Sequence, residues 1–389
     1  PRVGFAYRPF DNDRTVIRAG YGIFYLLQRG NNAVSNGIVN LPFIQDQFSS
    51  NFKTSSGVPA YTTQNLFAGP FASNGLDLSS ITLRIRPPYN QQWNFSIQQE
   101  LVPTLALQLA YVGNKGTRLD RDLPFNYPTP GPGNPSLRRP LPQFGAGDLY
   151  TNAGNSSYHA LQATLEKRFS AGLTFLSAFT WSKLIDDGNV SSSNFTYQDP
   201  SNLALDRGLG AFDVKYRSVN SFSYELPFGK GRRFGSAIPR ALDLAAGGWQ
   251  FAGIVTFQSG FPFSPTQSVD PSNTGYDYRP NVVGNPIPAQ QTIQQWFNPL
   301  AFAVPAAYTF GNAGRNILRG PGLQNWDLSL LKNFYFTERT YLEFRFEAFN
   351  AFNHPHFFNP DSNIQSPTAG KITSASDPRI LQLAMKIYF

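Results

Sequence analysis

The dominant pattern along the chain is an alternation of hydrophobic and polar residues with a period of two. In residues 91–101, the side chains of Trp93, Phe95 and Ile97 are separated by polar residues, and Leu101 continues the series. Successive side chains of a β-strand point to opposite faces, so this pattern predicts strands with one apolar and one polar face.

The pattern recurs in about eleven segments, each near the 9 to 11 residues that a tilted strand needs to cross a bilayer. By residue number these segments are 2–9, 14–26, 90–101, 104–113, 157–169, 172–183, 213–227, 248–259, 324–335, 338–350 and 378–389. Helical periodicity is almost absent. The sequence therefore predicts an all-β fold, an antiparallel transmembrane β-barrel.

The connections between these segments alternate between short and long. The short ones are 10–13, 102–103, 170–171 and 337, with a medium basic turn at 227–247. The long ones are rich in Pro, Gly, Asn and Ser and cover 27–89, 114–156, 184–212, 260–323 and 351–377. Bacterial outer-membrane barrels have short periplasmic turns and long extracellular loops, whereas a soluble sandwich has no reason for this asymmetry. We therefore expect the long loops to be extracellular and Phe389 to be periplasmic.

The composition fits a barrel better than a soluble protein. Of the 389 residues, 41% are hydrophobic and 15% aromatic, yet only 14% are charged. Many aromatic residues and few charges are expected where strands face lipid through aromatic girdles. The net charge of +8 is spread without a block of like charges, which argues against a nucleic-acid partner and favours contacts with outer-membrane lipid and lipopolysaccharide.

Several segments, in order along the chain, resemble the barrel of Oar-like TonB-dependent outer-membrane transporters. They include PRVGFAYRPF, PYNQQWNFSIQQEL, YVGNKGTRL, YELPFGKGRRF, GGWQFAGIVTFQSGFPF, GRNILRGPGLQNWDLSLLKNF and FEAFNAFNHPHF. The resemblance implies a 22-stranded barrel filled by an N-terminal plug and energised from the inner membrane through TonB, often behind a small carboxypeptidase-regulatory-like domain. The chain begins at Pro1 without an initiator Met or signal peptide, so we expect residues 1–389 to be the C-terminal half of the barrel, with plug, regulatory-like domain and TonB contact in a missing N-terminal region.

The polar faces of the strands supply the candidate ligand contacts. These residues are Gln92, Asn94, Gln98, Glu100, Gln162, Glu166, Arg168, Glu343, Arg345 and Glu347. Two interpretations stay open, because lumen positions must be polar in any case: the rows contact a ligand, or they bind a plug and lumen water. The charged residues Glu343, Arg345 and Glu347 could form a ladder with Asp327 on the preceding strand. The ligand itself is not identified.

The last strand, 380–389, alternates cleanly and ends on Tyr388 and Phe389. A terminal aromatic residue on such a strand resembles the signal that the barrel-assembly machinery reads. The alternative is a last strand whose end simply packs in the membrane interface.

Other motifs favour no catalysis, no cofactor and no metal. Loop glycines at 311, 314, 320 and 322, and the segment 228–233, do not lie between a strand and a helix, as a phosphate-binding loop requires. His354 and His356 lack a third ligand nearby, and the adjacent Asp186 and Asp187 are expected to be solvated. With three His and no Ser, His and Asp arrangement, we expect a protein that is not an enzyme.

Three functions remain open from the sequence. The first is active uptake of a bulky ligand through a plugged barrel, the second is a passive porin, and the third is a surface adhesion or structural protein.

The strand count also predicts an open sheet. With an odd number of strands, the first and the last run in the same direction, whereas single-chain bacterial barrels close with antiparallel pairs. We therefore expect a curved, open sheet with free edges near residues 2–9 and 380–389.

Overall fold

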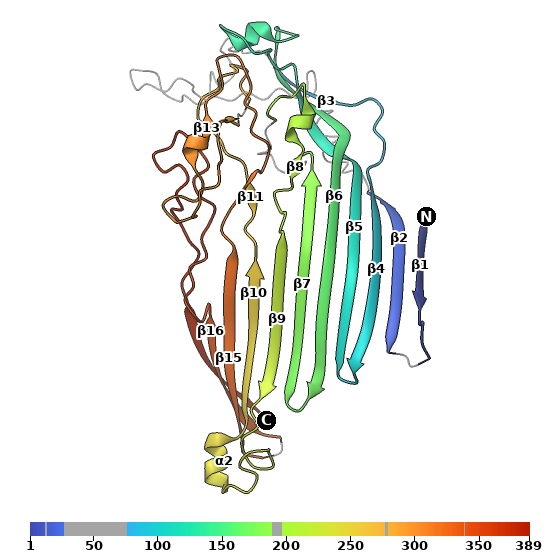
Figure 1. The fold of residues 1–389 in the computed structure, drawn as a ribbon, viewed down its shortest axis with the longest axis vertical. Coiled ribbons are helices and arrows are strands. Elements are labelled where there is room, and N and C mark those ends of the chain that lie inside the picture. The colour runs from blue at the N-terminus through green and yellow to red at the C-terminus, as the bar shows by residue number, and fades with distance from the viewer. Residues whose placement is uncertain (12–13, 27–75, 189–196, 277–278, 338) are drawn as a thin grey trace, which may run out of the picture.

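A computed structural model describes residues 1–11, 14–26, 76–188, 197–276, 279–337 and 339–389 of the chain. It contains one large antiparallel sheet whose strands follow the order of the sequence (Figure 1). In order, the strands of this wall are β1 (Arg2–Tyr7), β2 (Thr15–Tyr25), β4 (Tyr89–Val102), β5 (Leu105–Phe125), β6 (Phe144–Ser170), β7 (Leu173–Asp186), β9 (Tyr216–Glu225), β10 (Trp249–Gln258), β15 (Leu323–Tyr335), β16 (Tyr341–Phe349) and β17 (Ile380–Tyr388). Each of the eleven predicted segments corresponds to one of these strands, so the all-β prediction is confirmed.

Two strands are much longer than predicted. Pairing of β5 with β6 continues beyond the expected loop boundaries, as far as Phe125 opposite Gly147, with register shifts around Leu119. β3 (Leu76–Ile81) adds to this projection by pairing in parallel with β6, and the short β8 (Gly208–Leu209) pairs with β7. The projection lies among the long connections, where we expect neither face to meet lipid. The period-two signal is therefore lost there although the backbone ladder continues.

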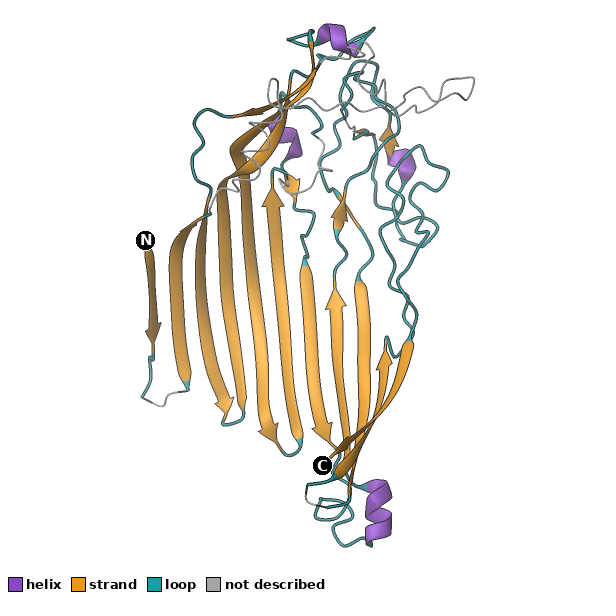
Figure 2. Ribbon diagram, turned by 180° about the vertical axis from the view of Figure 1, so that it is seen from behind, coloured by secondary structure: helices purple, strands orange, loops and turns teal. Residues whose placement is uncertain are grey.

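The connections alternate as predicted. Figures 1 and 2 show the described parts of the long connections gathered at one end of the sheet and the described parts of the short connections at the other. The turn between β9 and β10 contains a helix that the sequence reading did not predict, α2 (Arg240–Ala246). Asp243 fixes it, since its carbonyl oxygen accepts from the Gly247 N–H at 2.8 Å and its carboxylate accepts from the Lys230 N–H at 2.6 Å. No helix in the described part of the chain is long and apolar enough to cross a membrane.

The register gives the sheet two chemically different faces. Phe95 on β4 is opposite Tyr111 on β5, which is opposite Leu161 on β6 and then Trp181 on β7. These side chains are not packed into a core: Phe95 is 45% exposed and Trp181 is 56% exposed. An aromatic and aliphatic face left open over many strands is suited to lipid.

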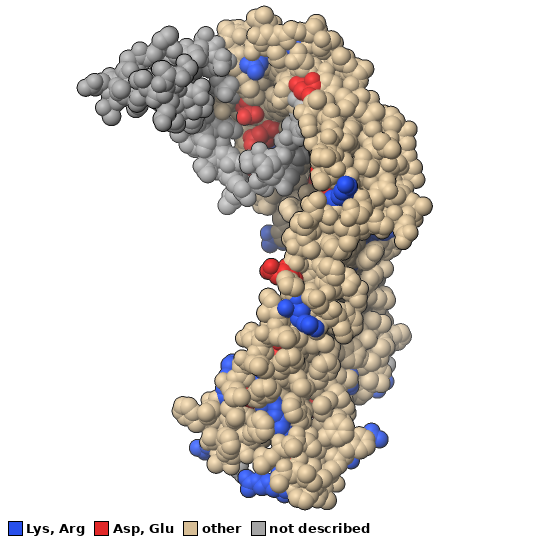
Figure 3. Space-filling view, turned by 90° about the vertical axis from the view of Figure 1, so that its left-hand side faces the viewer, with Lys and Arg blue, Asp and Glu red and all other residues tan. Residues whose placement is uncertain are grey.

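The sheet is open, as predicted. Among the described residues β1 pairs with β2 alone and β17 with β16 alone, and no ladder joins β1 to β17. Seen from its edge, the molecule is a crescent hollowed on one side (Figure 3). The outer backbone groups of β1 and β17 are consequently unpaired edges, which hydrocarbon does not tolerate without a partner strand.

Candidate ligand-binding face and loop cap

The first group of predicted contacts gathers on one face of β4 to β6. Gln98 lies there beside β2, where Arg18 Nη1 donates to Gln98 Oε1 at 2.7 Å. Glu100 and Glu166 are both opposite Ala106, one from each side of β5, so they share a row across the sheet. Gln162 is opposite Ala110, two rows from Glu100 and Glu166 on the same face. These small alanines leave room between the longer polar side chains.

Three other members of the group are more peripheral. Gln92 and Asn94 share the same face nearer the long loops, opposite Gly22 and Gly20 respectively. Arg168 lies at the other end, next to the turn before β7, where its N–H donates to the Thr104 carbonyl at 2.8 Å. The predicted contacts of β4 to β6 therefore spread along the full height of the wall.

The second group forms a charged ladder within β16. Arg345 lies between two carboxylates, 2.8 Å from Glu343 and 3.7 Å from Glu347. Asp327 is not part of it, since its carboxylate accepts from the Asn350 N–H at 2.9 Å and from Asn325 Nδ2 at 2.8 Å. The ladder on one strand is therefore present without the predicted member from β15, because the turn after β16 recruits Asp327 as a cap.

The long connections fold into a packed cap through buried ion pairs. Three arginines of the 259–322 connection reach acidic residues of β7 and the connection after it: Arg279 to Asp206 at 2.9 Å, Arg319 to Asp213 at 2.6 Å, and Arg315 to Asp186. Asp206 and Asp213 are almost fully buried. Buried carboxylates of this kind are tolerated only when they are paired and hydrogen-bonded. We name this unit, the described residues of 197–215 and 259–322, the loop cap.

A buried amide completes the link between the two connections. The Gln198 side chain donates to the carbonyls of Arg279 and Gly311, both at 3.0 Å, and accepts from the Arg279 N–H at 2.6 Å. Because Gln198 is 1% exposed, these bonds satisfy its amide away from water. The sequence did not predict the ion pairs of the loop cap, because the partners are 73 to 129 residues apart. Arg315 and Arg319 nevertheless lie in the GRNILRGPG segment that carried the resemblance.

An aromatic cluster stabilises the loop cap from within. Phe297 is fully buried, with its ring 6.0 Å from that of Phe263 and 5.9 Å from that of Phe302. Two short ladders surround it, β11 (Pro262–Phe263) with β14 (Leu318–Arg319) and β12 (Asn281–Val282) with β13 (Phe302–Ala303). The cap thus has its own small core, which gives it a defined shape.

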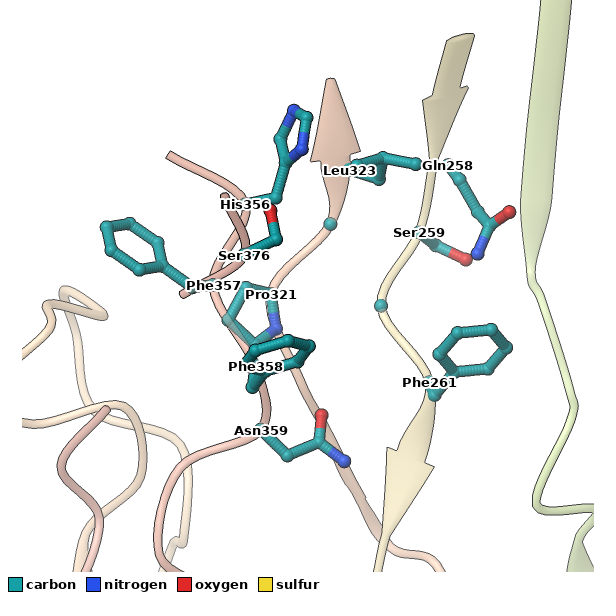
Figure 4. A pocket seen from close by; sticks show the side chains of 12 residues that line it. Gln258, Ser259, Phe261, Pro321, Leu323, His356, Phe357, Phe358, Asn359 and Ser376 are labelled. Carbon is teal, nitrogen blue, oxygen red and sulfur yellow. The ribbon is translucent and has the colours of Figure 1, made fainter. Parts of the chain in front are cut away.

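A pocket of about 420 Å³ opens where β10 and β15 leave the sheet and enter the long connections (Figure 4). Gln258 and Leu323 face each other across the two strands, and Phe261 and Phe358 line the walls. His356 also borders the pocket, with its Nε2 3.0 Å from the Gln324 carbonyl oxygen. A mixed aromatic and amide lining of this size suits one ring or short chain of a larger ligand.

The acidic pair and the loop glycines, for which the sequence favoured no binding or catalytic role, have structural roles. Asp186 and Asp187 are not merely solvated as expected, because Arg315 pairs with the first and Arg121, at 3.6 Å, with the second. The His354 and His356 rings are 6.3 Å apart, and no cluster of three potential ligands occurs in the described part of the chain. Gly311 and Gly320 lie where backbone or side-chain atoms approach too closely for a Cβ atom. They are packing glycines of the long connection.

The predicted assembly signal lies on the free edge of β17. Tyr388 stacks on Tyr341 of β16 with 4.5 Å between ring centroids, while Phe389 is 98% exposed. The exposed ring is accessible to a partner, and its role in assembly stays a prediction.

The chain matches a known family of outer-membrane proteins. A family model described as an outer membrane beta barrel domain matches residues 1–382. The chain belongs to this family. An antiparallel sheet with one apolar and one polar face is therefore part of an outer-membrane barrel.

Solved structures of outer-membrane proteins are similar to this chain over nearly its whole length. The outer membrane transporter YddB from Escherichia coli superposes with a TM-score of 0.53 at 10% identity, over 99% of this chain and 40% of that chain. Two further matches have lower scores. The pyoverdine outer membrane receptor FpvA from Pseudomonas aeruginosa has a TM-score of 0.47 at 12% identity, over 100% of this chain and 36% of that chain. The ferric-catecholate import receptor Fiu from E. coli has a TM-score of 0.44 at 10% identity, over 100% of this chain and 34% of that chain. The chain thus spans about two fifths or less of these proteins, and no curated protein matches it.

Proposed function

We propose that the chain is the C-terminal part of the barrel of an outer-membrane transporter that takes up a bulky ligand, and that this transporter is plugged, energised through TonB and Oar-like. The observation that carries the proposal is the combination of a two-faced barrel wall with a loop cap that is folded at one end. A passive pore needs no such cap, whereas a receptor needs a shaped surface to capture its ligand.

In this proposal the loop cap lies outside the cell and the pocket beside Phe261 and Phe358 contributes to capture. The polar rows of β4 to β6 and the ladder of β16 line the lumen, where they contact the ligand or the plug. A ladder already neutralised in part by Arg345 suits contact with a plug. The row of Glu100 and Glu166 has no ion-pair partner among the described residues and suits water or ligand.

Conductance of the full-length protein in planar bilayers tests the proposal. A plugged transporter gives no steady large channel, and removal of the region upstream of the barrel opens one. A steady large conductance from the untreated protein would instead support a passive porin. If the bilayer shows no channel and deletion of residues 260–323 abolishes surface attachment but leaves uptake intact, the adhesion function is supported.

A further inference from the structure

A second cavity lies on the apolar face of the wall, away from both free edges. It has a volume of about 670 Å³ and is lined by residues of β5, β6, β7 and the loop cap. Its apolar part consists of Tyr111, Leu161 and Trp181, which form one row across three strands. All three side chains are more than 40% exposed, so the sheet leaves this row uncovered.

A basic row lies directly above the apolar one, on the side of the long loops. His159 lies two residues before Leu161 on β6, and Lys183 lies two residues after Trp181 on β7. The two are opposite each other and on the same face as the apolar row. Lys215 and Arg319 border the cavity from the connection before β9 and from β14. Both lysines are exposed, and neither has a carboxylate partner within the part of the chain that the structure describes.

Positive charge dominates the rim. Asp213 is the one carboxylate among the lining residues, and it is already bound by Arg319 at 2.6 Å and by the Leu184 N–H at 2.6 Å. The histidine is held in place, with its Nδ1 2.7 Å from the Tyr111 hydroxyl and its ring 5.9 Å from that of Trp93. The Lys215 backbone is fixed as well, since its N–H donates to Ser259 Oγ at 2.9 Å. The two free lysines thus extend from a rigid frame.

From this arrangement we infer that the cavity binds the phosphorylated head of a glycolipid of the outer leaflet, lipopolysaccharide, with its acyl chains on the row of Leu161 and Trp181. Apolar surface next to lipid, capped by uncompensated lysines at the level of the aromatic residues, matches an amphiphile with an anionic head. A soluble phosphate would make no use of the apolar row. The inference rests on the proposed orientation, in which the loop cap is extracellular.

Native mass spectrometry of the full-length protein in mild detergent, titrated with diphosphoryl lipid A, tests this. Lys183→Gln combined with Lys215→Gln is expected to weaken binding about 25-fold, at about fivefold per lysine near an anionic surface. The matched control, Lys230→Gln with Arg233→Gln, removes the same charge from the turn at the other end of the sheet and should leave binding unchanged. Lys183→Arg with Lys215→Arg should retain it.

Two further arms identify the ligand. Dephosphorylated lipid A should bind the unmodified protein as weakly as diphosphoryl lipid A binds the glutamine variant, and inorganic pyrophosphate should not compete. Equal binding by the glutamine variant and the unmodified protein would overturn the inference, as would full competition by pyrophosphate. Heat-modifiable mobility of each variant checks that it is folded. None of these readouts depends on uptake or on a plug, so failure here is distinguishable from failure of the proposed transport function.

Discussion

Single residues decide whether the long connections form a rigid cap. The Arg279 guanidinium donates to Asp206 Oδ1 at 2.9 Å and also to the carbonyls of Ala313 and Leu205. Asp206 is fully buried, so loss of its cation would leave an uncompensated charge inside the protein.

We expect Arg279→Ala to destabilise the loop cap by about 3 to 5 kcal/mol, the usual effect of breaking a buried pair. Limited proteolysis of intact cells should then cleave within 259–322 much faster, while heat-modifiable mobility of the barrel is unchanged. Arg232→Ala is the control, because its pair with Glu225 at 2.9 Å is substantially exposed. Equal protease resistance of the Arg279 variant and the unmodified protein would show that the pair does not hold the cap together.

The pKa of a tyrosine in the loop cap reflects the burial of its side chain. Burial, followed by the negative charge of Asp148, raises the pKa of Tyr276 to about 12. A raised folded-state pKa means that the associated stability is fully present below the unfolded value of about 10 and is lost as pH rises through the folded value. The ultraviolet difference titration between the unmodified protein and Tyr276→Phe should therefore show phenolate near pH 12. Ionisation near pH 10 would mean that the ring is solvated.

At the scale of the elements, the period-two pattern predicted the strands and their faces well. It did so because lipid favours hydrophobic side chains at most alternate positions of a strand. The same signal could not predict the β5 and β6 projection or α2, which lie outside the lipid zone. Nor could it predict the pairs of Arg279, Arg315 and Arg319, since spacing along a loop does not determine which distant carboxylate each arginine reaches.

The two faces of an element should respond differently to the same change. Val255 lies near the middle of β10 on the apolar face, opposite Trp326, and Val255→Asp should cost about 2 kcal/mol of barrel stability. Gln98→Asp on the polar face should be mild. Phe344→Asp, also on the apolar face, is a weaker test, because Phe344 is opposite Lys332, which would compensate the new carboxylate. Heat-modifiable mobility measures all three, and equal loss in the Val255 and Gln98 variants would mean that the faces are assigned wrongly.

At the scale of the whole molecule, the proposed orientation in the membrane rests on the loop asymmetry and is open to a direct test. The sequence contains no Cys, so single cysteines report one position each. Leu300, 87% exposed in the loop cap, and Leu242, 59% exposed on α2, lie at opposite ends of the sheet. A membrane-impermeant maleimide should label Leu300→Cys on intact cells and Leu242→Cys only after lysis. The reverse result would invert the proposed topology.

The open sheet was also predictable, because it depends only on strand direction and count. The identity of the ligand was not, since polar rows serve a plug, water or a ligand with the same residue types. What the structure adds is the shape of the cap and its pockets, which come from contacts between distant loops.

We infer that one face of this sheet meets lipid and that the other lines the polar interior of the barrel. The most direct test places spin labels at single cysteines along residues 173–182 of β7, in the full-length protein reconstituted in liposomes. The measurement is the collision rate of each label with oxygen and with a water-soluble nickel chelate. We expect higher oxygen accessibility at odd positions and higher nickel accessibility at even positions. The even positions include Leu176, which the register places on the polar face despite its apolar side chain. Loss of the two-residue alternation, or lipid-like accessibility at position 176 and its even neighbours, would contradict it.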